Sequence, residues 1–311
     1  MQRRDFIYGA LVLGWSPVAN GNETMKSSTK RVTVGEEVAL STESTGNAAR
    51  GTILLVMGAT ASMVWWPESL VKRLASAGYQ VIRFDHRDTG RSTTNAPGDV
   101  RYDVSDIASD LIAILDAYNV EAAHVVGMSL GGYVSQIAAL THPDRILSLT
   151  LIATEPLGIP YDGEGIDPRF MDHFSRMAEL DWSDHDTVAS FMLRIAELNA
   201  GSVAHFDRKA SMRRIETELQ RTSSMQSAFN HSLIAGELDP NLKASNLDLP
   251  VLLVHGREDP IISVKATSAS ESAIKGAQVL VLEGRGHELL EQDMPQLAGA
   301  ILAHVGRQEQ R

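Results

Sequence analysis

The segment Gly127–Gly131 reads Gly-Met-Ser-Leu-Gly, and this Gly-x-Ser-x-Gly spacing is typical of a serine at a sharp turn between a strand and a helix. The flanking residues fit that context, because 124–128 form an apolar run and 130–140 have a helical pattern. Glycines on either side of the turn allow the strand and the helix to approach closely. Ser129 could therefore act as a nucleophile that stands clear of a sheet. A serine that caps the helix is the alternative.

A serine nucleophile requires a base that takes its proton and an acid that orients the base. Where this turn occurs, the chain order is serine, acid, histidine, and the last two each follow a strand. Asp259 follows a strand expected over residues 250–255. His287 follows a strand expected over residues 278–282. We predict that His287 is the base and that Asp259 orients it, with the adjacent Glu258 as the alternative acid.

The oxyanion formed in such a reaction is bound by two backbone N–H groups. One belongs to the residue after the nucleophile, Leu130. We assign the other to Ala59, in the loop after a strand expected over residues 52–57. Trp65 and Trp66 follow this loop, and they either wall the substrate pocket or pack beneath the elements that cover it.

Strand and helix patterns alternate from residue 32 onward, which predicts a mostly parallel, doubly wound sheet. The alternation stops over residues 156–245, where helical patterns follow one another without strands. We expect this segment to be a helical lid between two parts of one core, residues 32–155 and 246–308. We also expect an edge strand over Val38–Glu43 and a polar linker over residues 22–31.

Other polar residues near the expected site are given structural roles. The charged loop Asp85–Ser92 is expected to hold a turn through side-chain bonds to backbone groups. His124 and His255 lie at strand ends and are expected to pack, although His255 could line the site. His231 belongs to the lid, where contact with substrate is the alternative to packing.

The composition narrows the class of protein. The chain has 311 residues, 43% of them hydrophobic, no cysteine and a formal net charge of −11. An acidic chain is unsuited to nucleic acids and anionic membranes, which are bound mainly by Lys and Arg. The lack of cysteine excludes disulfides, thiolate metal sites and a cysteine nucleophile. The histidines lack the spacing found in zinc hydrolases, so we do not expect a bound metal.

The first 21 residues differ from the rest of the chain. Arg3 and Arg4 precede a short apolar run, Tyr8–Trp15, and small residues follow it. The run is too short to span a bilayer, and its order fits a secretory leader of the twin-arginine type. We expect export to the periplasm or the medium, with an N-terminal tail or helix of a cytoplasmic protein as the alternative. No later segment has the length of uninterrupted apolar residues that a membrane anchor needs.

Over residues 32–306 the chain resembles the α/β-hydrolase family, in which the serine turn, the acid and the histidine occur in this order. Three segments are similar to those of aclacinomycin methylesterase-like serine esterases: Val56–Ala59, Asp85–Thr93 and His124–Ser129. Enzymes of that group remove a methyl ester from a polyketide precursor without a cofactor. The resemblance implies an α/β-hydrolase fold and the roles assigned above to the three side chains and the two backbone amides.

Two features depart from the family. Its common His-Gly pair is replaced by Met57-Gly58, and the lid, which shapes the pocket, shows no resemblance. The predicted function is hydrolysis of a small-molecule ester, such as a methyl ester, through an acyl-enzyme. Hydrolysis of a lactone, a thioester, an amide or a carbon–carbon bond would use the same residues. The alternative from another class is a ligand-binding receptor that keeps the fold without turnover.

Overall fold

The computed structural model describes residues 27–202 and 206–307. The expected leader lies outside the described residues. The described strands form one sheet in the order β1-β2-β4-β3-β5-β6-β7-β8. Their bounds are β1 (Ser27–Val34), β2 (Val38–Thr45), β3 (Thr52–Val56), β4 (Gln80–Phe84), β5 (Ala123–Met128), β6 (Ile146–Ile152), β7 (Val251–Gly256) and β8 (Gln278–Leu282). Strands β3 to β8 pair in parallel, whereas β1–β2 and β2–β4 are antiparallel, so the predicted mostly parallel sheet is confirmed.

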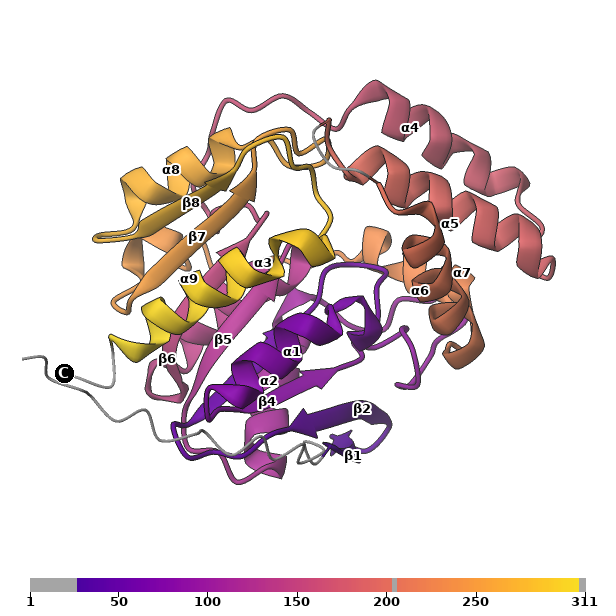
Figure 1. Ribbon diagram of the computed structural model, residues 1–311. Coiled ribbons are helices and arrows are strands. Elements are labelled where there is room, and N and C mark those ends of the chain that lie inside the picture. The colour runs from indigo at the N-terminus through magenta and orange to yellow at the C-terminus, as the bar shows by residue number, and fades with distance from the viewer. Residues whose placement is uncertain (1–26, 203–205, 308–311) are drawn as a thin grey trace, which may run out of the picture.

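Helices cover both faces of the sheet (Figure 1). Their bounds are α1 (Glu68–Ser76), α2 (Val104–Ala117), α3 (Leu130–Thr141), α4 (Pro168–Ser175), α5 (His185–Asn199), α6 (Arg208–Arg221), α7 (Met225–Ala228), α8 (Lys265–Ala273) and α9 (Met294–Gly306). Leu54 and Val56 of β3 pack in the core on the α2 and α3 side, whereas Ile53 and Leu55 pack on the α1 and α9 side. Because side chains alternate along a strand, a strand covered on both faces is buried throughout and mainly apolar, as β3 is.

The segment between β6 and β7 contains α4 to α7, which lie together at one end of the sheet (Figure 1). We call residues 156–245 the helical insertion. It has its own apolar cluster, which includes Phe191, Ile215 and Phe229. The ring of Trp65, from the loop after β3, packs against this cluster and joins it to the sheet.

The expectations for the N-terminal part are wrong in two respects. Residues 27–31 belong to β1 and not to a linker, and β1 rather than Val38–Glu43 is the edge of the sheet. Only Val32 of β1 is buried, and the other side chains of this outer strand are exposed or half-buried. A strand with so little burial needs no apolar alternation, which is why its polar sequence resembles a linker.

Two further structural properties bear on function. Within residues 27–202 and 206–307, no helix combines the length and the apolar character needed to cross a membrane. The same part of the chain has no cluster of three or more His, Asp and Glu side chains that could hold a metal ion.

Candidate active site

Ser129 occupies the turn between β5 and α3 in a left-handed conformation, with φ of 52°. Such a conformation is strained for a residue with a side chain, and it persists only when its surroundings enforce it. The Ser129 N–H donates to the carbonyl of Ile152 at 2.8 Å. The Ser129 carbonyl accepts from the N–H of Tyr133 at 3.0 Å and from the hydroxyl of Thr154 at 2.7 Å. These bonds fix the turn at the carboxyl end of the sheet.

The glycines around Ser129 are required by close approach. A Cβ atom on Gly131 would collide with the carbonyl of Val56 at the end of β3, and one on Gly127 would collide with the backbone of Gly131. In the loop after β3, a Cβ atom on Gly58 would lie 3.3 Å from Cβ of Ser129. The loop predicted to bind the oxyanion therefore lies directly beside the serine.

His287 and Asp259 are in direct contact, as their places after β8 and β7 predict. His287 Nδ1 lies 2.6 Å from Asp259 Oδ2. Because a carboxylate only accepts, the proton of this bond is on Nδ1, so in the neutral ring the lone pair is on Nε2. His287 therefore has the tautomer that a base for serine requires.

Asp259 is held by both of its oxygens. Oδ1 accepts the backbone N–H groups of Ile261 and Ile262 at 2.8 and 2.9 Å. Oδ2 lies 3.2 Å from Nε2 of His255, in addition to its bond with His287. Burial favours the neutral carboxyl group, but the two histidine rings outweigh it and hold the pKa of Asp259 well below its ordinary value. The acid is thus ionised and fixed in place.

The alternative acid, Glu258, is directed elsewhere. Its carboxylate accepts the N–H and the hydroxyl of Ser202 at 2.7 and 2.6 Å.

His255 has a role that the sequence does not reveal. Its Nδ1 lies 2.7 Å from the hydroxyl of Thr267 and its Nε2 lies 2.9 Å from the carbonyl of Ile262, so the ring packs, as expected, and also braces Asp259.

The loop that carries Ala59 is held by two buried histidines. His86 Nε2 donates to the carbonyl of Met57 at 2.9 Å. His231 Nδ1 accepts the N–H of Thr60 at 2.9 Å, and its Nε2 donates to the carbonyl of Arg87 at 2.8 Å. Burial, together with His231, lowers the pKa of His86 to about 3, and burial also lowers the pKa of His231. Both rings therefore act as neutral hydrogen-bonding groups.

The two assigned backbone amides, of Ala59 and Leu130, each lie beside a backbone turn. Thr60 has a left-handed φ of 64°, which turns the chain directly after Ala59. Leu130 is the first residue of α3, so its N–H has no acceptor within the helix. Neither His86 nor His231 is predicted by the sequence to hold this loop, because both contacts join residues that are far apart along the chain.

A cavity of about 430 Å³ lies beside the serine. Ser129, His287 and Ala59 line it from the sheet end, and the helical insertion covers it with Phe170, Met192 and other apolar side chains. Trp65 also lines the cavity. Trp66 does not: it is fully buried in the core shared by α1 and α9, so of the two alternatives given for the tryptophans, Trp65 lines the pocket and Trp66 packs.

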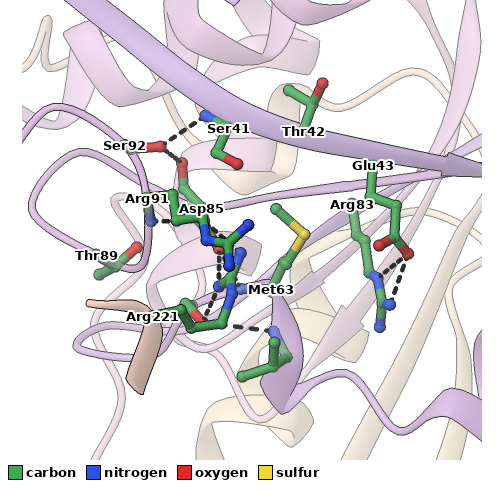
Figure 2. A network of polar contacts seen from close by, with 12 residues as sticks. Ser41, Thr42, Glu43, Met63, Arg83, Asp85, Thr89, Arg91, Ser92 and Arg221 are labelled. Carbon is green, nitrogen blue, oxygen red and sulfur yellow. Dashed lines mark hydrogen bonds and ion pairs between the residues drawn. The ribbon is translucent and has the colours of Figure 1, made fainter. Parts of the chain in front are cut away.

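The loop after β4, residues Asp85–Ser92, is held by side-chain bonds to backbone groups, as expected. Figure 2 shows Asp85 at the centre of a network that joins this loop to the helical insertion. Its carboxylate accepts the backbone N–H groups of Met63 and Arg91, each at 2.9 Å. It also accepts two bonds from Arg221 of α6, both at 2.9 Å. The carbonyl of Asp85 accepts the hydroxyl of Ser92 at 2.6 Å.

Comparisons with known proteins agree with this architecture. A model described as the alpha/beta hydrolase fold matches residues 51–293. Rhodomycin D methylesterase DnrP from Streptomyces peucetius is 31% identical over 291 residues, which cover 88% of this chain and 97% of that protein. A solved esterase from a Rhodococcus species has a TM-score of 0.72 at 21% identity, over 89% of this chain and 98% of its own. An esterase from Exiguobacterium antarcticum has a TM-score of 0.71 at 16% identity, over 89% and 98%.

The matched range covers most of the chain and includes the serine turn, the helical insertion and the loops of Asp259 and His287. The expected resemblance to methylesterases is also confirmed, because the relative at 31% identity has that name. The protein belongs to the alpha/beta hydrolase family.

Proposed function

We propose that this protein hydrolyses a carboxylic ester, with Ser129 as nucleophile, His287 as base and Asp259 as the acid that orients the base. The observation that carries the proposal is the 2.6 Å hydrogen bond from His287 to Asp259, on a ring that shares the wall of one cavity with Ser129. The methylesterase relative supports the same chemistry.

The reaction proceeds in two halves. Ser129 Oγ attacks the ester carbonyl carbon while its proton passes to His287 Nε2, and the oxyanion is bound by the N–H groups of Ala59 and Leu130. The tetrahedral adduct collapses, Nε2 returns the proton to the leaving alkoxide, and the acyl group stays on Ser129. Water then attacks the acyl carbon with Nε2 as base, which releases the acid and restores the serine. The sum is one ester and one water converted to one acid and one alcohol.

The proposed substrate is a methyl ester, or another ester of a small alcohol, with an apolar acyl group. The methylesterase relative supports the small alcohol. The apolar lining by side chains such as Phe170, Met192 and Phe229 supports the apolar acyl group. We propose that the helical insertion acts as a lid, because its side chains form one wall of the cavity.

The test is hydrolysis of methyl esters of increasing acyl length by wild type and by Ser129→Ala. We expect the variant to lose at least about 1,000-fold in kcat, the effect of removing a triad nucleophile. A fluorophosphonate should label the wild type at Ser129 and leave the variant unlabelled. Ser272→Ala is the matched control, because Ser272 lies exposed on α8 and bonds only within that helix to Ser268.

Two results would contradict the proposal. Activity retained by Ser129→Ala would exclude that serine as the nucleophile. Equal inactivity of both proteins on all esters, with binding of a small ligand retained, would favour the receptor that has the fold without turnover.

A further inference from the structure

Two ionisable side chains besides His287 line the mainly apolar cavity among the described residues: Arg214 and Glu288. Arg214 comes from α6 in the helical insertion, and Glu288 follows His287 directly in the chain. The side chain of Glu288 is 6% exposed and that of Arg214 is 15% exposed. Burying such groups is unfavourable unless they are paired, so their partners need to be identified.

The contact between Arg214 and Glu288 is loose. It consists of one approach, Nη1 to Oε1, at 3.4 Å. By contrast, Arg87 binds Asp110 through two bonds of 2.8 and 2.7 Å, the forked geometry that arginine and carboxylate favour. The Arg214–Glu288 pair therefore leaves much of the hydrogen-bonding capacity of the carboxylate unused.

Unused polar atoms gather at this part of the cavity wall. Oε2 of Glu288 is buried and has no hydrogen-bond partner among the described residues, and the same holds for Oδ1 of Asn199 and Nε1 of Trp65. All three residues line the cavity. Asn199 and Trp65 each contact a neighbour of Glu288. The Asn199 carbonyl accepts the N–H of His287, the residue before Glu288, at 2.8 Å. The guanidinium of Arg214, the partner of Glu288, lies 5.4 Å from the centre of the Trp65 ring.

We propose that Glu288 is a specificity-determining residue, which accepts a hydrogen bond from a hydroxyl group on the acyl part of the ester substrate. The inference rests on the proposed ester hydrolysis and specifies its substrate further. A hydroxyl is favoured over an ammonium group, because Arg214 already balances the charge of Glu288 and a second cation would lose its hydration in an apolar cavity.

The protonation of Glu288 is compatible with this role. Burial raises the pKa of Glu288 to about 7, against the opposing effect of Arg214. Near neutral pH the carboxyl group is thus present in both forms. A hydroxyl group can pair with either form, since it both donates and accepts hydrogen bonds.

The experiment compares methyl 6-hydroxyhexanoate, 8-hydroxyoctanoate and 10-hydroxydecanoate with the corresponding unsubstituted methyl esters. The readout is the ratio of kcat/KM within each matched pair, so that a general loss of activity cancels. We expect the wild type to prefer the hydroxylated ester at one chain length or more. Glu288→Leu should reduce that preference about 10-fold or more, the usual effect of losing one hydrogen bond to a charged group. Glu288→Gln keeps an acceptor oxygen and should retain part of the preference.

Two further variants make the result decisive. Arg214→Met/Glu288→Leu removes both charges at similar volume, so it should fold even if Glu288→Leu does not, and it should lose the same preference. Glu283→Leu is the matched control, because Glu283 lies outside the cavity, where it pairs with Arg257 at 2.9 Å, and its ratio should equal that of the wild type.

The outcomes separate the two proposals. If Ser129→Ala is inactive but the wild type shows no preference for a hydroxylated ester, or if the double variant keeps the preference, this inference alone is overturned. If Ser129→Ala retains activity, the proposed function fails and this inference fails with it.

Discussion

The salt bridge between Arg221 and Asp85 should be a main attachment of the helical insertion to the sheet domain, and Arg221→Leu tests this. Asp85 is fully buried, and the side chain of Arg221 is 12% exposed. Arg221 makes two 2.9 Å bonds to the carboxylate of Asp85 (Figure 2). It makes a third bond, at 2.8 Å, to the hydroxyl of Ser62. Leucine would fill part of the space and remove all three bonds.

The expected loss of stability follows from the charge left behind. Removing one partner of a buried ion pair costs about 3 to 5 kcal/mol, because the other charge stays buried without compensation. Asp85 would keep its bonds from the backbone N–H groups of Met63 and Arg91, which places the effect at the lower end, at about 3 kcal/mol. At about 2 °C or more per kcal/mol for a chain of this size, the melting temperature should fall by roughly 6 °C.

The assay is urea unfolding followed by circular dichroism, together with thermal unfolding. Arg176→Leu is the matched control, because Arg176 pairs with Asp172 at 2.9 Å on the exposed surface. Such a pair contributes less than about 1 kcal/mol. Arg221→Leu with Asp85→Asn should recover part of the loss, since the buried carboxylate is then neutral.

The comparison of these variants decides whether the salt bridge has this role. If Arg221→Leu and Arg176→Leu lower the free energy of unfolding equally, the Arg221–Asp85 pair does not attach the insertion. If the added Asp85→Asn change does not restore any of the free energy of unfolding, the loss comes from the packing of the arginine stem and not from the unpaired carboxylate of Asp85.

Two other predictions concern pH and export. Burial raises the pKa of Glu218 to about 7 from an ordinary 4.5, so its protonated form stabilises the fold fully below pH 4.5, and this contribution is lost as pH rises to 7. The free energy of unfolding of Glu218→Gln, measured with urea, should therefore rise by about 3 kcal/mol relative to that of the wild type between pH 4.5 and 7. A difference between the two proteins that stays constant over this range would contradict the raised pKa. We also propose that residues 1–21 direct export. In a bacterial host with a twin-arginine pathway, mass spectrometry of the exported protein should find a first residue within 21–25. Replacing Arg3 and Arg4 by lysines should block export. Exported protein that begins at Met1 would exclude a cleaved leader.

The sequence predicts the sheet and the order of the proposed catalytic residues well, because both depend on local patterns. Apolar runs such as that of β3 mark strands covered on both faces, and the loop after each strand is then assigned to the carboxyl end of the sheet. The sequence does not indicate helix α8, since this helix buries only Ala266, Thr267 and Ser270 and has no apolar stripe. Strand β1 resembles a linker for the same reason, which is the lack of a buried face.

The supporting contacts of the site could not be predicted, because they join residues that are distant in the chain. His231 holds Thr60 across 171 positions, and the sequence offers no signal for this pairing. His255 follows a clear strand pattern, but its contact with Asp259 depends on how the next loop folds back. Trp65 and Trp66 are adjacent and chemically identical, and only the path of the backbone places one in the cavity and the other in the core.

Helix α6 explains why the insertion is attached through polar contacts. Arg214, Glu218 and Arg221 are spaced by four and three positions, so they share one face of the helix. In an isolated helix such a charged face would be assigned to solvent, yet the side chain of Glu218 accepts a 2.6 Å bond from the hydroxyl of Ser62 and is buried. This face contacts the sheet domain at successive points, first Glu288 beside the cavity, then Ser62, then Asp85.

Polar contacts of this kind have a functional consequence. Directed bonds favour a single orientation of the insertion over the cavity. The bond that is weakest by geometry, 3.4 Å between Arg214 and Glu288, is the one at the cavity wall. The strong contact of Arg221 with Asp85 therefore anchors the helix at one end, and the loose pair at the other end leaves Glu288 free to bind substrate.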